Sequence, residues 1–254
     1  MLRGAVSKRI DNDPLFQWRG ENVTRIENLS DIVFALALGM VVSTSTPPVT
    51  FDDLGRFLLN IFPVSAAFLL LLQLWNTHFV YFRRYGLADG RTILLNALLL
   101  LVVMFLAYPL RFVFDGLFGV ILALFGHPQL LFDMEIEPKD AGIIMAYFGV
   151  GYGAAYTLIG LLYSNALHKA EQLALDATEV IVTKRSVASC FIRVFCSALV
   201  VVCALVFPLG AFAGFLLFLF YPLRALARRR YKIPKSKVAP EKEPSIDEDT
   251  ADTV

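Results

Sequence analysis

The stretch RIENLSDIVFALALGMVVSTST, residues 25–46, decides the fold of this protein. It begins with charged side chains, is uncharged and apolar from residue 32 to 42, and ends in hydroxyl residues. An apolar run of this length, together with its flanks, is typical of a helix that crosses a bilayer, which needs about 17–25 residues. Because Asp31 is the one acid within the expected span, its role in this helix is the central question.

The composition extends this interpretation to the whole chain. Of 254 residues, 57% are hydrophobic and 18% are charged, and the mean hydropathy is +0.64, whereas soluble domains have about 25% charged residues. We therefore expect an all-α integral membrane protein with six transmembrane helices. The expected spans are residues 30–46, 58–82, 92–113, 141–167, 187–207 and 209–226. Residues 116–126 are too short to span alone, so they either extend the third helix or re-enter the membrane.

The distribution of basic residues predicts the orientation. Lysines and arginines concentrate before the first span, after the second, after the fourth and after the sixth, whereas the other three loops hold only Arg56, Arg111 and Lys139. By the positive-inside rule, we expect both termini in the cytoplasm of a multi-pass protein of the plasma membrane. Residues 1–24 are then a cytoplasmic segment, 25–230 the six-helix domain, and 231–254 a disordered cytoplasmic tail that is polar and acidic at its end.

The sequence carries no recognisable motif for catalysis or cofactor binding. His78, His127 and His168 lack a second histidine or a carboxylate at metal-binding spacing, and no phosphate-binding loop is present. The letters GVGYG at 149–153 invite comparison with a potassium-channel filter, but their place inside a long apolar stretch favours close helix packing. We expect no enzyme, no metal, no cofactor, no nucleic-acid ligand and no soluble partner, with the lipid bilayer as the surroundings.

The first span has two distinct faces at 100° per residue. One face carries Leu29, Leu36, Met40 and Ser43 within roughly 60° of one another, and we call this set the Leu36 stripe. Asp31 projects roughly 140° away from Leu36, on a side that also carries small residues. Asp31 is therefore expected to point toward neighbouring helices and not along the Leu36 stripe.

Other polar residues lie at the same expected depth as Asp31. An ionisable side chain within a span costs about 2.5–3.5 kcal/mol on insertion scales, so it needs partners. We predict a structural hydrogen-bond cluster made of Ser30, Asp31, Trp75, His78 and Asn96. The alternative for Trp75 and His78 is an interfacial anchor belt. Arg25, on the cytoplasmic side, can reach carboxylates or line an inner vestibule.

These segments resemble the signatures of the TMEM175 family of lysosomal and prokaryotic potassium channels. Residues 25–31, RIENLSD, resemble the RxxxFSD motif that opens the first helix of that family. Residues 75–78, WNTH, resemble its tryptophan–histidine motif, and residues 89–109 resemble its third helix. The resemblance covers residues 24–109 through motifs and the last three spans through topology.

The resemblance implies a homotetramer in which the first helices surround a central pore and potassium is the permeant ion. Members lack a carbonyl filter, and hydrophobic side chains of the first helix form the constriction. The pore-facing positions of the family fall at Leu36, Met40 and Ser43 here, with Arg25 and Leu29 toward the pore vestibule. The expected function is passive potassium transport by a cation channel, and proton permeation through the same pore is left open.

The chain departs from the family pattern at four positions. Leu29 stands for the phenylalanine of the motif, Phe79 for a second histidine, Gly39 for a common threonine and Ser43 for an apolar residue. Gly39 removes a hydroxyl near the constriction, which bears on potassium selectivity. Ser43 predicts a hydrophobic constriction of two layers and not three.

The chief rival function is a proton- or cation-coupled secondary transporter in which Asp31 and His78 titrate during the cycle. Its support is this acid–histidine pair and the glycine-rich fourth span, and no internal repeat is visible. A membrane-embedded scaffold or lipid enzyme would need a set of polar cavity residues that the sequence does not present. Voltage-driven flux without a coupled ion would distinguish the channel from the transporter.

Overall fold

The computed structural model describes residues 15–20, 22–43, 49–126, 138–207 and 210–231, and within these ranges it contains helices and no strand. The helices are α2 (Arg25–Ser43), α3 (Phe51–Leu59), α4 (Ile61–Tyr85), α5 (Gly90–Leu124), α7 (Pro138–His168), α8 (Ala177–Val206), the 3-10 helix η1 (Gly210–Leu219) and α9 (Phe220–Arg230). Five of the described helices are long and apolar enough to cross a membrane. Residues 232–254 of the expected tail and most of the expected segment 1–24 lie outside the described residues.

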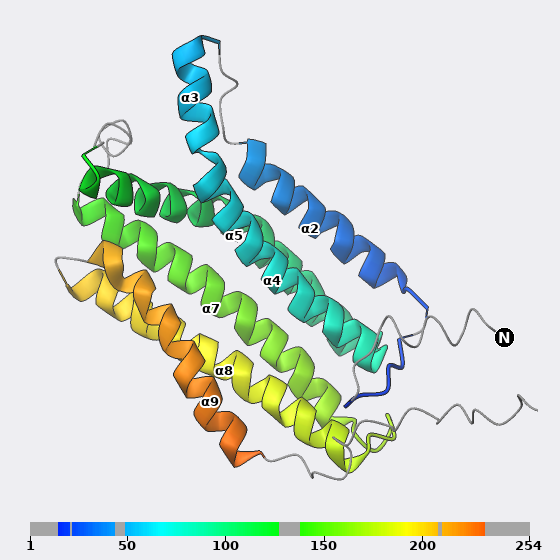
Figure 1. Ribbon diagram of the computed structural model, residues 1–254. Coiled ribbons are helices and arrows are strands. Elements are labelled where there is room, and N and C mark those ends of the chain that lie inside the picture. Colours follow the sequence, from blue (N-terminus) through cyan, green and yellow to red (C-terminus); the bar gives the residue numbers. More distant parts are fainter. Residues whose placement is uncertain (1–14, 21, 44–48, 127–137, 208–209, 232–254) are drawn as a thin grey trace, which may run out of the picture.

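The first three long helices pack as one group (Figure 1). α2 contacts α4 and α5, and it buries Phe34, Ala37 and Val41 on the side that faces them. These residues recur every three or four positions, which is the spacing of one face of a helix. α4 and α5 contribute buried leucines to the same core, such as Leu71 and Leu99.

α5 is one continuous helix of 35 residues. It includes residues 116–124, so extension of the third helix is the alternative that the structure shows for this segment. Pro109 lies inside α5. A proline removes one backbone hydrogen bond, and helices in membrane bundles tolerate this where neighbouring groups satisfy the freed carbonyl.

α7 and α8 form the most extensively packed pair of helices. A Cβ atom added at Gly149 would lie 2.8 Å from Val201 Cγ2, and one added at Gly153 would lie 2.8 Å from Ser197 Oγ. Ser197 Oγ also donates a hydrogen bond to the carbonyl of Gly149. Glycine here permits the two helices to approach closely. The GVGYG run is thus a helix-packing surface within this chain.

The sixth expected span takes an unexpected form. Its first part, η1, is a 3-10 helix of 10 residues, and α9 follows it to Arg230. Runs of 3-10 helix longer than three or four residues are uncommon. η1 packs against both α7 and α8, and at its first residue Gly210 lies against the carbonyl of Ala204.

Most of the long helices run along a common axis, and α2 and α9 lie at opposite sides of the bundle (Figure 1). The start of α2 and the ends of α4, α7 and α9 gather at the same end of the bundle. The connections between α4 and α5 and between α7 and α8 are therefore at this end too. It is the end that the basic residues predict to face the cytoplasm.

Candidate functional site

The start of α2 is fixed by a reciprocal cap. Thr24 Oγ1 accepts a hydrogen bond from the backbone N–H of Glu27 at 3.3 Å, and Glu27 Oε2 accepts one from the N–H of Thr24 at 3.1 Å. This is a capping box, which satisfies two free donors at a helix start. Glu27 is buried, and its Oε1 lies 3.8 Å from Arg83 Nε of α4. The first turn of α2 is thereby tied to the last turn of α4.

The Leu36 stripe is largely uncovered by the rest of the described chain. Leu29 and Leu36 are each 55% exposed, Ser43 is exposed, and Met40 is half-buried. Arg25, one turn before Leu29, is exposed as well. A run of exposed apolar side chains on one helix face calls for cover by lipid or by another protein surface.

Asn96 of α5 joins three helices through buried hydrogen bonds. Its Nδ2 donates to Ser30 Oγ of α2 at 2.9 Å, and its Oδ1 lies 2.8 Å from Nε2 of His78 of α4. Because an amide oxygen accepts, the imidazole donates through its Nε2–H. Ser30 Oγ in turn donates to the carbonyl of Ile26 at 2.8 Å. Ser30, His78 and Asn96 are all buried, and each of the three takes part in at least one of these hydrogen bonds, as buried polar side chains usually do.

Asp31 is held by α4 on the outside of this buried group. Trp75 Nε1 donates to Asp31 Oδ1 at 2.8 Å, in an exposed position. The Trp75 ring stacks on Phe79 with centroids 5.3 Å apart, and the guanidinium of Arg83 lies 5.3 Å from the centroid of Phe79. Phe79, which stands for the second histidine of the family pattern, thus supports the tryptophan. The structure brings the five residues of the predicted cluster together in two parts, the buried Ser30–Asn96–His78 chain and the exposed Asp31–Trp75 pair.

Comparison with known proteins identifies the relatives of this chain. A family model described as the endosomal/lysosomal potassium channel TMEM175 matches residues 25–106. A potassium channel from Marivirga tractuosa is 34% identical over 226 residues, which cover 83% of this chain and 88% of that protein. The chain belongs to the TMEM175 family. A crystal structure of a variant of the potassium channel MtTMEM175, in complex with a nanobody–MBP fusion protein, matches with a TM-score of 0.76 and 32% identity, covering 86% of this chain and 97% of that chain.

The TMEM175 relationship confirms the resemblance read from the motifs and the expected channel fold. The matched residues 25–106 contain the whole polar cluster and the Leu36 stripe. The solved relative extends the shared fold over most of the chain. Membership in a family of channels also confirms that the protein is not an enzyme.

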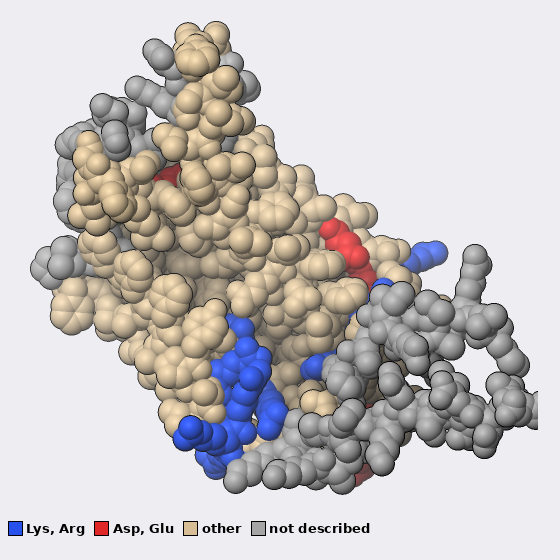
Figure 2. All heavy atoms as spheres, viewed as in Figure 1, with Lys and Arg blue, Asp and Glu red and all other residues tan. Residues whose placement is uncertain are grey.

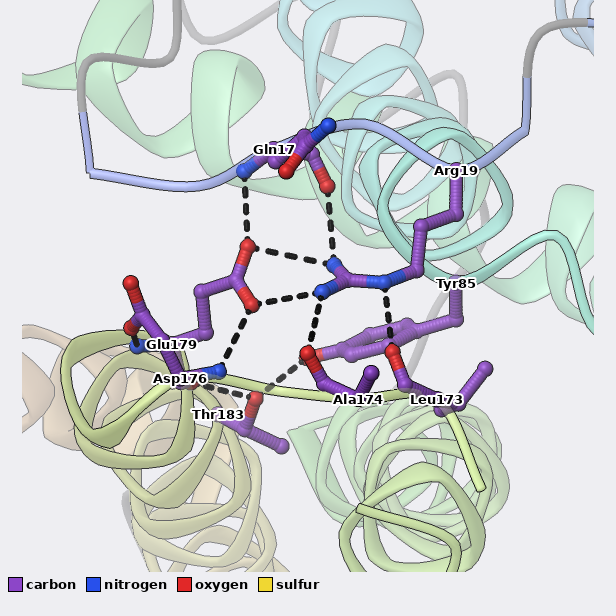
Figure 3. A network of polar contacts seen from close by, with 8 residues as sticks. All are labelled: Gln17, Arg19, Tyr85, Leu173, Ala174, Asp176, Glu179 and Thr183. Atoms are coloured by element: carbon purple, nitrogen blue, oxygen red, sulfur yellow. Dashed lines mark hydrogen bonds and ion pairs between the residues drawn. The ribbon is translucent and has the colours of Figure 1, made fainter. Parts of the chain in front are cut away.

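A second polar network, which the sequence motifs did not indicate, clamps the segment before α2 onto the start of α8 (Figure 3). Glu179 Oε2 accepts from Arg19 Nη2 at 2.7 Å, and Glu179 Oε1 accepts from the N–H of Gln17 at 2.8 Å. Arg19 Nε donates to the carbonyl of Leu173 at 2.7 Å. Asp176 and Glu179 form a capping box, and this D-x-x-E pattern before an apolar run was the available signal that α8 begins at Ala177, ten residues before the expected span.

A third polar group lies between the α4–α5 connection and the end of α7. Asp89 accepts from Thr92 Oγ1 at 2.7 Å and pairs with Lys169 Nζ at 3.0 Å. Asn165 Nδ2 donates to Thr92 Oγ1 at 3.2 Å. Partial burial raises the pKa of Asp89, but the Thr92 hydrogen bond and the Lys169 ammonium lower it more, so the pKa lies below its ordinary value.

Metal-ligating residues do not gather in the part of the chain that the structure describes. No group of three or more His, Cys, Asp or Glu residues there is placed to hold an ion. Cys190 and Cys196 are buried free thiols, and Cys203 is half-buried. The described polar groups therefore bind one another and backbone groups, which suits them to holding helices in place.

Proposed function

We propose that this protein is a potassium-permeable cation channel of the plasma membrane, a homotetramer in which α2 of each subunit surrounds the pore. The observation that carries the proposal is the uncovered apolar face of α2, where Leu29 and Leu36 are more than half exposed. The two relatives described above are named as potassium channels, which supports the same ion for this chain.

The constriction of the proposed pore lies along the Leu36 stripe. Rings of Leu36 and Met40 would make two hydrophobic layers, and a ring of Ser43 would follow them with hydroxyl groups. A hydrophobic constriction can close by direct contact or by loss of water from the pore. Arg25 and Leu29 would line the vestibule on the cytoplasmic side, where the positive-inside rule leads us to expect both termini as well.

The polar cluster would set the rotation of α2 about its own axis. The hydrogen bond from Asn96 to Ser30 and the bond from Trp75 to Asp31 both act on the first third of the helix. They direct these side chains toward α4 and α5, which leaves the Leu36 stripe on the uncovered side. Asp31 would therefore act as a structural group and not as an ion-binding group.

Substitution of Leu36 tests the constriction. We expect Leu36→Asn and Leu36→Ala, in protein reconstituted into liposomes with a potassium gradient, to change the rate of potassium flux or the potassium-to-sodium flux ratio. Val42→Ala is the matched control, because Val42 is an exposed apolar residue of the same helix that lies off the stripe. Potassium flux and selectivity equal to those of the wild type in both Leu36 variants would refute the constriction.

The transporter remains the second candidate because Asp31 of α2 and His78 of α4 both lie where these two helices pack. Asp31 contacts Trp75 of α4, and His78 contacts Phe34 of α2. Voltage-driven potassium current without a proton gradient supports the channel, and strict dependence on a second ion supports the transporter. Asp31→Asn and His78→Gln should abolish transport by a coupled carrier, whereas in the channel they should lower stability and leave a potassium current. Proton flux in the same liposomes tests whether the pore also passes protons.

A further inference from the structure

A basic pocket lies among α4, α8 and α9, on the side of the bundle away from α2. Its volume is about 240 Å³, and five arginines from these helices line it. They are Arg84 of α4, Arg185 and Arg193 of α8, and Arg224 and Arg228 of α9. Figure 2 shows basic side chains gathered along α9 and the neighbouring part of α8. No aspartate or glutamate of the described chain lines this pocket.

Two of these arginines lie against aromatic rings, and one of them is buried in the helix bundle. Arg193 is 8% exposed, and its guanidinium carbon lies 3.7 Å from the centroid of the Phe220 ring and 4.7 Å from that of Tyr156. The guanidinium of Arg224 lies 5.6 Å from the same Phe220 ring, and its buried Nε has no hydrogen-bond partner among the described residues. Buried cations without a counter-charge are costly, and intramembrane arginines commonly mark a functional site.

An apolar cavity adjoins the basic pocket. Its volume is about 450 Å³, and it lies between α5, α7 and η1. Its lining is mostly aliphatic and aromatic, with Phe112, Leu117, Phe148 and Phe215 among its walls. Arg193 lines both cavities, so the two spaces share the side chain of this one residue.

We propose that these two cavities form a binding site for an anionic phospholipid, with its phosphate among the five arginines and part of an acyl chain in the apolar cavity. Guanidinium groups bind phosphate oxygens through paired N–H donors. Basic pockets between membrane helices bind the head groups of anionic lipids. Free phosphate would match the arginines and leave the apolar cavity unfilled. The acidic residues 243–254 would also match the charge, but they supply few apolar side chains.

The head-group half of the site is tested on α9 with two pairs of substitutions that remove equal charge. Arg224→Gln/Arg228→Gln alters two residues of the pocket, whereas Arg229→Gln/Arg230→Gln alters two exposed residues that do not line it. We expect native mass spectrometry of the purified full-length protein to show at least fivefold less bound phosphatidylglycerol for the first pair and less than a twofold change for the second. Equal losses in the two variants, or equal binding of phosphatidylcholine and phosphatidylglycerol by the wild type, would overturn the proposal.

The acyl half is tested at Gly116, which lines the apolar cavity and where an added Cβ would meet no atom within 4 Å. Gly116→Phe should fill part of the cavity and reduce phosphatidylglycerol binding at least threefold, and Gly116→Ala should not. If inorganic phosphate displaces the lipid completely at micromolar concentration, the site is a phosphate site and the lipid proposal is wrong. If phosphatidylglycerol binds after deletion of residues 233–254 and not to the full chain, the acidic tail occupies the pocket and the proposal is likewise wrong.

Discussion

α2 and α7 are both membrane-length helices, but the chain surrounds them differently. In the most apolar part of α7, 56% of the residues are buried inside the subunit, compared with 28% in α2. α7 contacts α4, α5, α8 and η1, and it approaches α8 closely through glycines. α2 contacts α4 and α5, where buried and exposed polar groups hold it.

The difference shows what each kind of contact determines. Glycine packing sets the distance between two helices, because it removes the side chains that would separate them. Hydrogen bonds are directional, so those of Ser30 and Asp31 fix which face of α2 turns toward its own chain. In the proposed pore α2 needs this second kind of control, because rotation of the helix about its axis by ~100°, the angle between successive residues, would bring a different row of side chains to the uncovered side.

The largest effect is expected at Gly142, where α7 packs directly against the backbone of α8. A Cβ atom at Gly142 would lie 2.6 Å from the carbonyl oxygen of Ala204, and a backbone atom cannot turn away as a side chain can. We expect Gly142→Val to lower the free energy of unfolding by about 3 kcal/mol through overpacking. The measurement is the melting temperature of the purified protein in detergent.

Gly39→Val is the control for this comparison, because an added Cβ at Gly39 of α2 meets no atom of the described chain within 4 Å. It should leave the stability of the subunit within about 0.5 kcal/mol, as is usual for exposed positions. If Gly39→Val leaves the melting temperature unchanged but alters the mass of the assembly measured by light scattering, another subunit covers this face. Equal loss of melting temperature in the two variants would break the distinction between α2 and α7.

The second effect concerns the buried part of the polar cluster. Asn96→Leu removes the partner of both Ser30 and His78 and leaves the imidazole buried without its acceptor. We expect a loss of about 2 kcal/mol in the free energy of unfolding, which is typical for a buried polar group left unsatisfied. Asn76→Leu is the matched control, since Asn76 of α4 is exposed. A similar loss of melting temperature for Asn76→Leu would mean that the Asn96 bonds are not what stabilises this region.

The sequence predicts the first half of this protein better than the second for a physical reason. Ser30, His78 and Asn96 could be brought together because polar residues are rare in spans and depth in the membrane follows from counting residues. Nothing in the sequence signals the contact of Gly142 with Ala204. Both are common residues in apolar helices, and their contact depends on tertiary packing. The same holds for η1, whose composition does not separate a 3-10 helix from an α-helix, and for the basic pocket, whose arginines come from three helices.

A smaller effect is expected at the exposed part of the cluster. Trp75→Phe removes the Nε1–H that binds Asp31 but keeps an aromatic ring against Phe79. Because water can replace the lost donor at an exposed carboxylate, we expect a loss of about 0.5–1 kcal/mol in the free energy of unfolding. A loss as large as that of Asn96→Leu would show that the Asp31–Trp75 pair is shielded from water in the assembled protein.

The smallest effect is expected at the ion pair of Asp89 and Lys169, which joins the α4–α5 connection to the end of α7. The pKa of Asp89 lies below its ordinary value, so the carboxylate adds stability at neutral pH that is lost as the pH falls through this lowered pKa, below about 4. Its side chain is 31% exposed, so solvent screening should limit the contribution to a few tenths of a kcal/mol. Between pH 6 and pH 3, the melting temperature of Asp89→Asn should therefore fall slightly less than that of the wild type. Lys169→Gln should likewise show a smaller fall in melting temperature than the wild type over this range. If Asp89→Asn and the wild type lose stability in parallel over this range, the ion pair does not couple the α4–α5 connection to α7, and α5 and α7 are held together by the Asn165–Thr92 hydrogen bond and by apolar contact.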